Sequence, residues 1–241
     1  RRDFGRHGTE SAARQSYQIR CNSPIPEKPL ARASGLGVRG RNSLIITKEA
    51  GSLVILAAMT LPFVLESAVS GIDNDMDDDG ADFPLCGLCT GADGTGTPRC
   101  VTACPTGALR GDGVVMLERC IQWYASGNDA GRDFSKFGDG GELADIPPQI
   151  AAKWGRRLYG CTACQDACPH NRRPIAGTPP EDTARGVLPA RLNGRELLAL
   201  DSTALKARFK GTALGMAWLT ADILRRNIRT ALGGGTETPR T

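Results

Sequence analysis

The residues of this chain best suited to chemistry are its cysteines, nine among 241 residues, of which eight lie between Cys86 and Cys168. Because their number is odd and their distribution clustered, a disulfide framework for the whole chain is disfavoured. Eight clustered thiolates are the number that two sites with four ligands each require. The cysteines therefore predict metal binding.

The spacing of these cysteines predicts which kind of metal site they form. The first sequence motif follows C-x2-C-x10-C-x3-C-P and the second C-x2-C-x3-C-P, with Cys120 alone between them. In proteins with two 4Fe-4S clusters, the cysteine before proline in one motif binds the cluster of the other motif. This rule predicts one cluster held by Cys86, Cys89, Cys100 and Cys168, and a second held by Cys104, Cys120, Cys161 and Cys164.

A pair of zinc ribbons is the alternative, since tetrahedral zinc also uses paired C-x2-C units. Zinc does not account for the C-x3-C-P ending of both sequence motifs, so the iron–sulfur interpretation is preferred. One departure concerns residues 90–99, where ten residues stand in place of the usual two. A glycine-rich insertion costs little loop entropy, and we expect the first site to tolerate it.

Two further motifs are weak. Gly35, Gly37 and Gly40 have the G-x-G-x-x-G spacing of dinucleotide-binding turns, but no Val/Ile-rich strand leads into them. The acidic stretch 71–82 resembles the start of a calcium-binding loop, yet Cys86 stands where the bidentate Glu belongs. A solvated linker is the preferred interpretation of that stretch.

The composition is that of an ordinary globular protein, with 40% hydrophobic residues and a net charge of only +4. So small an excess does not by itself indicate a nucleic-acid-binding protein, although residues 201–231 carry a local excess of four positive charges. The most apolar run, residues 53–65, is too short to span a membrane. Residues 5–24 are too polar for an export signal, so we expect a cytoplasmic protein with no membrane partner.

Hydrophobic periodicity predicts the elements around the cysteines. We expect a short strand near Ser16–Arg20, a helix over Glu27–Ala33, and buried strands at Ser43–Thr47 and Leu53–Met59. Beyond the cysteines, we expect helices over Gly194–Leu200, Ser202–Phe209 and Ala213–Leu232, followed by a frayed tail.

Several strings of the sequence are similar to the epoxyqueuosine reductase family over about residues 16–232. They are PEKPLARASGLGVRGRN at 26–42, Gly51-Ser52, CPTGAL at 104–109, Arg119-Cys120, YGCTACQDACPHNR at 159–172, FKGTAL at 209–214 and LRRN at 224–227. Much of the family's long N-terminal region has no counterpart here. The chain is therefore interpreted as an N-terminally truncated or divergent paralogue.

The resemblance implies an α+β fold and four parts. These are a partial nitroreductase-like α/β region at 1–70 that faces a corrinoid, an acidic linker at 71–82, a double 4Fe-4S ferredoxin-like domain at 83–175 and a helical segment at 176–241. The family's cofactors are two 4Fe-4S clusters and a cobalamin, and its reaction reduces epoxyqueuosine in tRNA to queuosine. The implied partners are a reduced ferredoxin or flavodoxin-type electron donor, tRNA, and a chain that completes the N-terminal domain.

The resemblance also implies roles for single residues. A corrinoid-facing surface would be formed by Gly35, Gly37, Gly40, Asn42 and Ser52. Cys21 stands where the family has the Asp proposed as proton donor, so it becomes a candidate catalytic thiol; a small buried hydrophobic residue is the alternative. A function from another class also stays open, namely a ferredoxin-like electron-transfer module with no substrate of its own.

Overall fold

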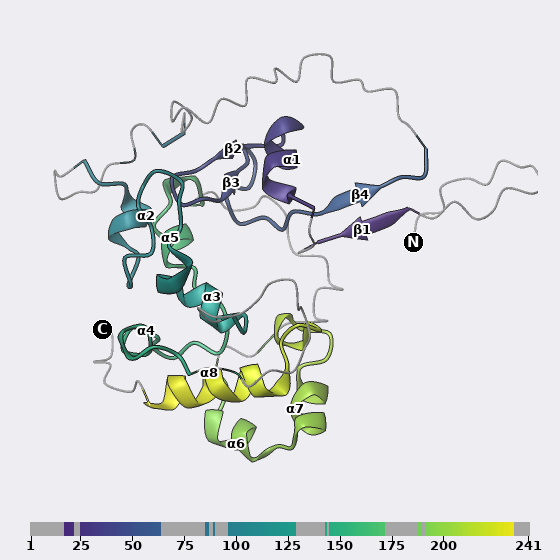
Figure 1. Cartoon of the computed structure of the whole chain (residues 1–241), viewed down its shortest axis with the longest axis vertical. Helices are drawn as coiled ribbons and strands as arrows, with labels where there is room; N and C mark the ends of the chain where they lie inside the picture. Colours follow the sequence, from purple (N-terminus) through teal and green to yellow (C-terminus); the bar gives the residue numbers. More distant parts are fainter. Residues whose placement is uncertain are drawn as a thin grey trace, which may run out of the picture.

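The computed structural model describes residues 17–21, 25–63, 85–86, 89, 96–128, 143, 145–171, 188 and 191–233 (Figure 1). The predicted linker at 71–82, most of the insertion at 90–99 and the tail after residue 233 lie outside these ranges. The described part contains both helices and sheets. In Figure 1 the strands and the C-terminal helices lie on opposite sides of the cysteine-bearing segment.

The N-terminal strands form two small antiparallel sheets. Strand β1 (Gln18–Arg20) pairs with β4 (Ala58–Thr60), and β2 (Val38–Arg39) pairs with β3 (Ile45–Ile46). Helix α1 (Glu27–Ala33) has the predicted bounds and ends where Gly35 adopts a φ of 71°. Such a φ favours glycine, which explains why the helix stops there.

The predicted buried strand at Leu53–Met59 is wrong. Only Ala58 and Met59 belong to β4, and the side chain of Ile55 is 85% exposed. The physical reason is that pairing needs a partner, and β1 supplies only three residues for it. The strand expected at Ser43–Thr47 is present as the shorter β3, whose two isoleucines are buried.

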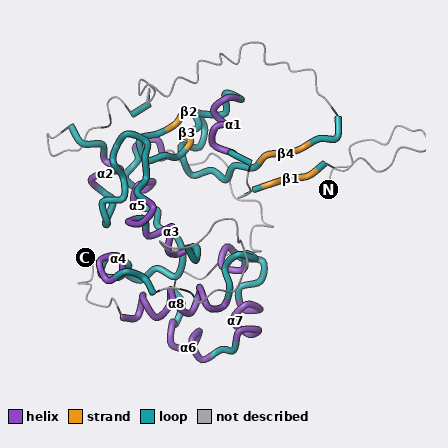
Figure 2. The backbone as a smooth tube through the Cα atoms, viewed as in Figure 1, coloured by secondary structure: helices purple, strands orange, loops and turns teal. Residues whose placement is uncertain are grey.

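The cysteine-bearing segment is mostly loop with very short helices (Figure 2). These are α2 (Arg99–Thr102), η1 (Leu117–Arg119), α3 (Ile121–Ala125), α4 (Pro148–Ala151), α5 (Ala163–Asp166) and η2 (Pro169–Asn171). Helices α2 and α5 lie against each other, although about 60 residues separate them in the sequence. One hydrophobic core supports this segment around Ile121, Tyr124, Ile150 and Trp154.

The C-terminal helices are α6 (Gly194–Ala199), α7 (Ser202–Arg208), η4 (Ala213–Gly215) and α8 (Ala221–Gly233). Side chains of Asn193 and Asp201 cap the N-termini of α6 and α7, as polar residues at these positions should. The single helix predicted at Ala213–Leu232 is wrong, because this range contains two separate helices, η4 and α8. None of the helices in the described part of the chain has the length and apolar character that crossing a membrane demands.

Candidate iron–sulfur sites

All nine cysteines are free thiols, and eight of them line two cavities, four in each. The contact between α2 and α5 brings segments of the two cysteine motifs together. Cys100 lies in α2 and Cys164 lies in α5, whereas Cys120 and Cys168 directly precede α3 and η2. The very short helices thus place each thiol at or next to a turn.

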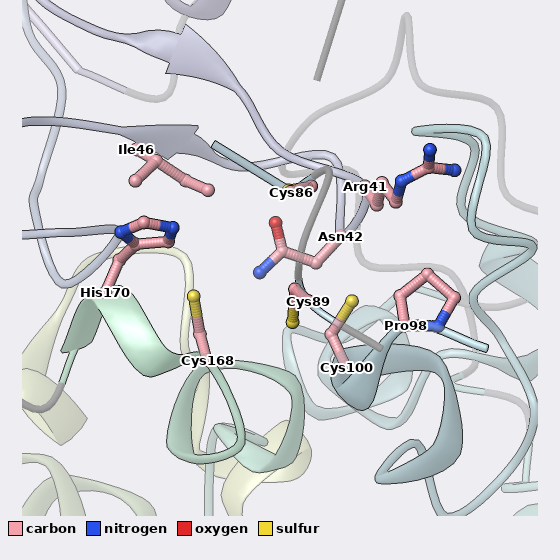
Figure 3. Close-up of a pocket in the computed structure, with 9 residues that line it drawn as sticks. All are labelled: Arg41, Asn42, Ile46, Cys86, Cys89, Pro98, Cys100, Cys168 and His170. Atoms are coloured by element: carbon pink, nitrogen blue, oxygen red, sulfur yellow. The ribbon is translucent and has the colours of Figure 1, made fainter. Parts of the chain in front are cut away.

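The first group surrounds a narrow cavity of about 10 Å³ (Figure 3). Its thiols come from four places in the sequence, and they are those of Cys86, Cys89, Cys100 and Cys168. The other residues of the wall are Arg41, Asn42, Ile46, Pro98 and His170. The structure therefore brings together the four cysteines of one predicted ligand set.

The second group lines a much larger cavity of about 970 Å³. Its thiols are those of Cys104, Cys120, Cys161 and Cys164. These are the four cysteines of the other predicted ligand set. Among the described residues, no three side chains of His, Cys, Asp or Glu are grouped closely enough to hold a single metal ion.

The pKa values show that thiols within each group face one another. Burial, followed by repulsion from Cys89 and Cys86, raises the pKa of Cys100 to about 11. Burial also raises the pKa of Cys168, and Cys89 and Cys86 add to this increase. A positive charge placed among these thiols would remove the repulsion, which is the environment that iron supplies.

The second group shows the same effect. Burial, followed by repulsion from Cys161, raises the pKa of Cys164 to about 12. Burial raises the pKa of Cys120, to which Cys161 and Cys104 contribute. Cys164 is also repelled by Cys100 of the first group, so the two groups adjoin.

Cys104 differs from its neighbours because hydrogen-bond donors surround its sulfur. Burial alone would raise its pKa, but donors from Thr106, Ala108 and Leu109 outweigh burial and lower it. The backbone N–H of Ala108 donates to Sγ at 3.2 Å, and the Thr106 hydroxyl lies 3.8 Å from it. This loop, CPTGAL, is therefore shaped to stabilise a thiolate.

Asn171 connects the second cysteine motif to the N-terminal region. Its Oδ1 accepts the backbone N–H of Ser52 at 2.7 Å, and its Nδ2 donates to Oγ of Ser52 at 2.9 Å. Gln165, next to Cys164, donates from Nε2 to the carbonyl of Ser52 at 2.7 Å. The turn at Ser52 is thus attached directly to the segment that carries Cys164 and Cys168.

The β2–β3 turn makes a second connection. Arg39 donates to the carbonyl of Gly113 at 2.9 Å, and Arg41 donates to the carbonyl of Gly111 at 2.8 Å. Within the second group, Oε1 of Gln122 accepts the backbone N–H of Cys161 at 3.2 Å. These polar contacts hold the walls of both cavities in place.

The residues expected to face a corrinoid do not form one open surface. A Cβ on Gly37 or Gly40 would come within 2.8 Å of the β3 isoleucines, so both glycines serve the packing of the hairpin. Ser52 is bonded to Asn171, and Asn42 lines both cavities. A Cβ on Gly35 would have no atom within 4 Å.

Cys21 lies at the end of β1, is exposed, and lines neither of the two cavities. The alternative of a small buried hydrophobic residue is therefore wrong. The structure does not bring Cys21 together with the other predicted site residues.

Sequence reasoning missed the polar residues that support the thiols. Gln122 and Asn171 act through contacts with residues 39 and 119 positions away, which no local pattern records. For Asn171, its place two residues after Pro169 in the second motif was the available signal.

Comparison with known proteins agrees with this geometry. Residues 85–171 match a family described as the 4Fe-4S double cluster binding domain. The chain is 30% identical over 223 residues to an epoxyqueuosine reductase of Vibrio cholerae, which covers 91% of this chain and 50% of the relative. The epoxyqueuosine reductase of Escherichia coli is 30% identical over 214 residues, which covers 88% and 46%.

Solved structures of epoxyqueuosine reductases have a fold similar to that of this chain. The epoxyqueuosine reductase of Streptococcus thermophilus superposes with a TM-score of 0.60 at 23% identity, over 92% of this chain and 50% of that one. An epoxyqueuosine reductase solved with an epoxyqueuosine-modified tRNA-Tyr stem loop superposes with a TM-score of 0.58 at 26% identity, over 91% and 49%. The chain spans about half the length of these relatives. It is thus similar to the epoxyqueuosine reductases over most of its own length, and its residues 85–171 match the 4Fe-4S double cluster binding domain.

Proposed function

We propose that this chain holds two 4Fe-4S clusters and passes electrons between them, as the redox part of an oxidoreductase like epoxyqueuosine reductase. One observation carries the proposal: the fold sorts eight cysteines into two groups of four, and each group equals a ligand set expected from the crossing rule. The contact between α2, which carries Cys100, and α5, which carries Cys164, supports a short path between the clusters.

The chain's own residues hold the clusters and shield them unequally. Cys100 and Cys168 are buried, and their group encloses a narrow cavity, whereas the second group opens into a cavity of about 970 Å³. When bound, each cluster supplies a site for one electron at a potential set by its hydrogen bonds and exposure. Electrons from a ferredoxin or flavodoxin-type donor are accordingly proposed to enter at the second, more open cluster.

The proposal extends to tRNA carrying epoxyqueuosine as the substrate. It is supported by the relative that was solved with an epoxyqueuosine-modified tRNA stem loop. Exposed cations of the C-terminal segment, among them Arg208, Lys210 and Arg229, are side chains suited to contact phosphate groups.

A corrinoid and a partner chain form the finer part of the proposal. The β1–β4 ribbon exposes large apolar side chains, including Ile19 at 60% and Met59 at 57%. Such a ribbon suits one edge of a nitroreductase-like α/β region that further protein covers. Because Ser52 is bonded to Asn171, and Gly37 and Gly40 pack against β3, we propose that the corrinoid is bound only where that further protein is present.

An electron-transfer module without its own substrate is the second candidate. It is favoured by Cys21, which occupies the place of the family's proton donor but is exposed and lines neither cavity. The two candidates share the clusters and differ in the presence of a corrinoid and a substrate.

The test is to purify and reconstitute the chain without oxygen, in the presence of cobalamin, and to measure iron, sulfide, zinc and cobalt per chain. About eight iron and eight sulfide are expected, and the variants C100S and C104S should each fall to about four. C21S is the matched control and should keep all eight. Zinc without sulfide would overturn the proposal.

Cobalt and turnover separate the two candidates. Stoichiometric cobalt, together with conversion of epoxyqueuosine in a tRNA-Tyr stem loop by dithionite-reduced protein, would support the reductase. Eight iron with neither cobalt nor conversion, even after mixing with candidate partner chains, would favour the electron-transfer module.

A further inference from the structure

Asn42 lines both cavities, and it lies among the thiols of the first group. It occupies the turn between β2 and β3, which is closed by hydrogen bonds from Gly40 to Leu44 (2.7 Å) and from Ser43 to Gly40 (2.8 Å). Its side chain is only 4% exposed and forms part of the wall of the first cavity. In Figure 3 its amide extends into the space between Cys168, Cys89 and Cys100.

The amide has a defined orientation. Its Oδ1 accepts the backbone N–H of Leu44 at 3.2 Å, so the oxygen is held by the turn itself. The Nδ2 end is left to face the cavity, and in Figure 3 this nitrogen is directed towards the sulfur atoms. A donor is therefore presented to the centre of the ligand set.

Two neighbouring residues adapt the turn to this arrangement. A Cβ on Gly40 would lie 2.8 Å from Oδ1 of Asn42 and 2.7 Å from Cδ1 of Ile46, so only glycine leaves room for the amide. Ser43 adopts a φ of 65°, which is unfavourable for a residue other than glycine. Backbone strain of this kind is found where a site imposes a particular geometry.

The other polar side chains of the wall are engaged elsewhere. Arg41 donates to the carbonyl of Gly111 at 2.8 Å, and in Figure 3 its guanidinium points away from the thiols. Nε2 of His170 lies 2.8 Å from the carbonyl oxygen of Leu85. Of the non-cysteine residues in this wall, Asn42 is the one whose donor is aimed at the sulfurs.

We propose that Asn42 is a positioning residue of the first cluster, whose Nδ2–H donates a hydrogen bond to a sulfur of a 4Fe-4S cluster held by Cys86, Cys89, Cys100 and Cys168. The inference rests on the proposed function. One-electron reduction adds a negative charge to the cluster and breaks no bond. A donor to sulfur stabilises that added charge, so Asn42 raises the reduction potential of the first cluster.

The test is a redox titration of the reconstituted full chain, followed by electron paramagnetic resonance, with iron and sulfide counted on the same samples. N42L removes the donor and keeps the branched shape of the side chain in a somewhat larger volume, and N42D replaces the donor with an acceptor of the same shape. The potential of one cluster should become more negative in N42L and still more negative in N42D. The second cluster of the same molecule is the internal control, and C86S assigns the signals by removing the first cluster.

The outcomes separate this inference from the function on which it rests. Wild-type protein without eight iron and eight sulfide would overturn the proposed function itself. Eight iron in all samples with both potentials unchanged in N42L and N42D would overturn only the role of Asn42. If N42L loses the first cluster, N42A decides, because it removes the donor and adds neither bulk nor charge: a more negative potential supports the inference, and an unchanged one overturns it.

Discussion

Gly51 shows how a single residue controls the position of the N-terminal region. It adopts a φ of 62°, and a Cβ there would lie 2.2 Å from Oδ1 of Asn171 and 2.6 Å from the carbonyl oxygen of His170. The next residue, Ser52, donates its backbone N–H to Oδ1 of Asn171 and accepts a hydrogen bond from Gln165 at its carbonyl oxygen. Glycine at 51 therefore allows the turn to approach the backbone that follows Cys168.

Gly51→Ala should destabilise the protein more than Gly35→Ala. Both residues have a positive φ, which costs an alanine about 1–2 kcal/mol. At Gly35 nothing lies within 4 Å of the new methyl group, whereas at Gly51 it meets backbone, which adds about 1–3 kcal/mol. Denaturant unfolding of the reconstituted variants measures the difference. Equal losses would show that the contact with Asn171 and His170 is not tight.

At the scale of elements, local patterns predicted what local physics determines. Helix α1 was predicted with its observed bounds because Gly35 ends it, and the caps at Asn193 and Asp201 mark the start of α6 and α7. The region from Leu53 to Met59 was misjudged because its apolar side chains suggest burial. Burial depends on what packs against the run, and Ile55 is 85% exposed.

The candidate site likewise combines features that local sequence determines with features that depend on tertiary contacts. The two cysteine groups follow from spacing and the crossing rule, both of which are written in the sequence. The role of Asn42 does not, because it depends on a turn from the N-terminal region reaching thiols that lie more than 40 residues further along the chain. Its neighbouring glycines directed the sequence interpretation to a ligand face, although Gly37 and Gly40 serve the packing of β3.

Helix α8 joins the C-terminal helices to the cysteine-bearing segment through a buried amide. Asn227 is 0% exposed, and its Nδ2 donates to the carbonyls of Ala125 and Leu158 at 2.9 and 3.0 Å. Ala125 ends α3, the helix that starts after Cys120. The position of Cys120 thus depends on Asn227, which lies more than 100 residues further along the chain.

Asn227→Leu should lower stability by about 2–4 kcal/mol. Two buried carbonyls lose their donor, and each such loss costs about 1–3 kcal/mol. The loss is partly offset because Oδ1 of Asn227 is itself buried without a partner among the described residues. Arg229→Ala, on the exposed face of the same helix, should change stability by less than about 0.5 kcal/mol. Thermal unfolding monitored by circular dichroism makes the comparison, and a loss below that of Arg229→Ala would contradict the role of Asn227.

In the molecule as a whole, apolar packing is unevenly distributed. One hydrophobic core lies around α3 and Trp154, and the other lies among the C-terminal helices, where Leu205, Phe209 and Leu219 are fully buried. Residues 96–120 belong to neither core of the described residues. Helices as short as α2 are not stable in isolation, so this segment needs another source of order. The three thiols of this segment, Cys100, Cys104 and Cys120, indicate that the clusters provide it.

Removing the iron should therefore loosen the molecule unequally. After anaerobic extraction of the clusters with a chelator and an oxidant, amide hydrogen exchange in residues 96–120 should accelerate at least about tenfold, which corresponds to about 1.4 kcal/mol of local stability. Exchange in α8 should change much less, because Ile223, Leu224 and Ile228 remain packed in their own core. The C21S variant carried through the same extraction controls for oxidation of the exposed thiol. Uniform acceleration along the chain would instead mean that the clusters stabilise the fold as one cooperative unit, and no change at all would mean that protein contacts alone order the cysteine-bearing segment.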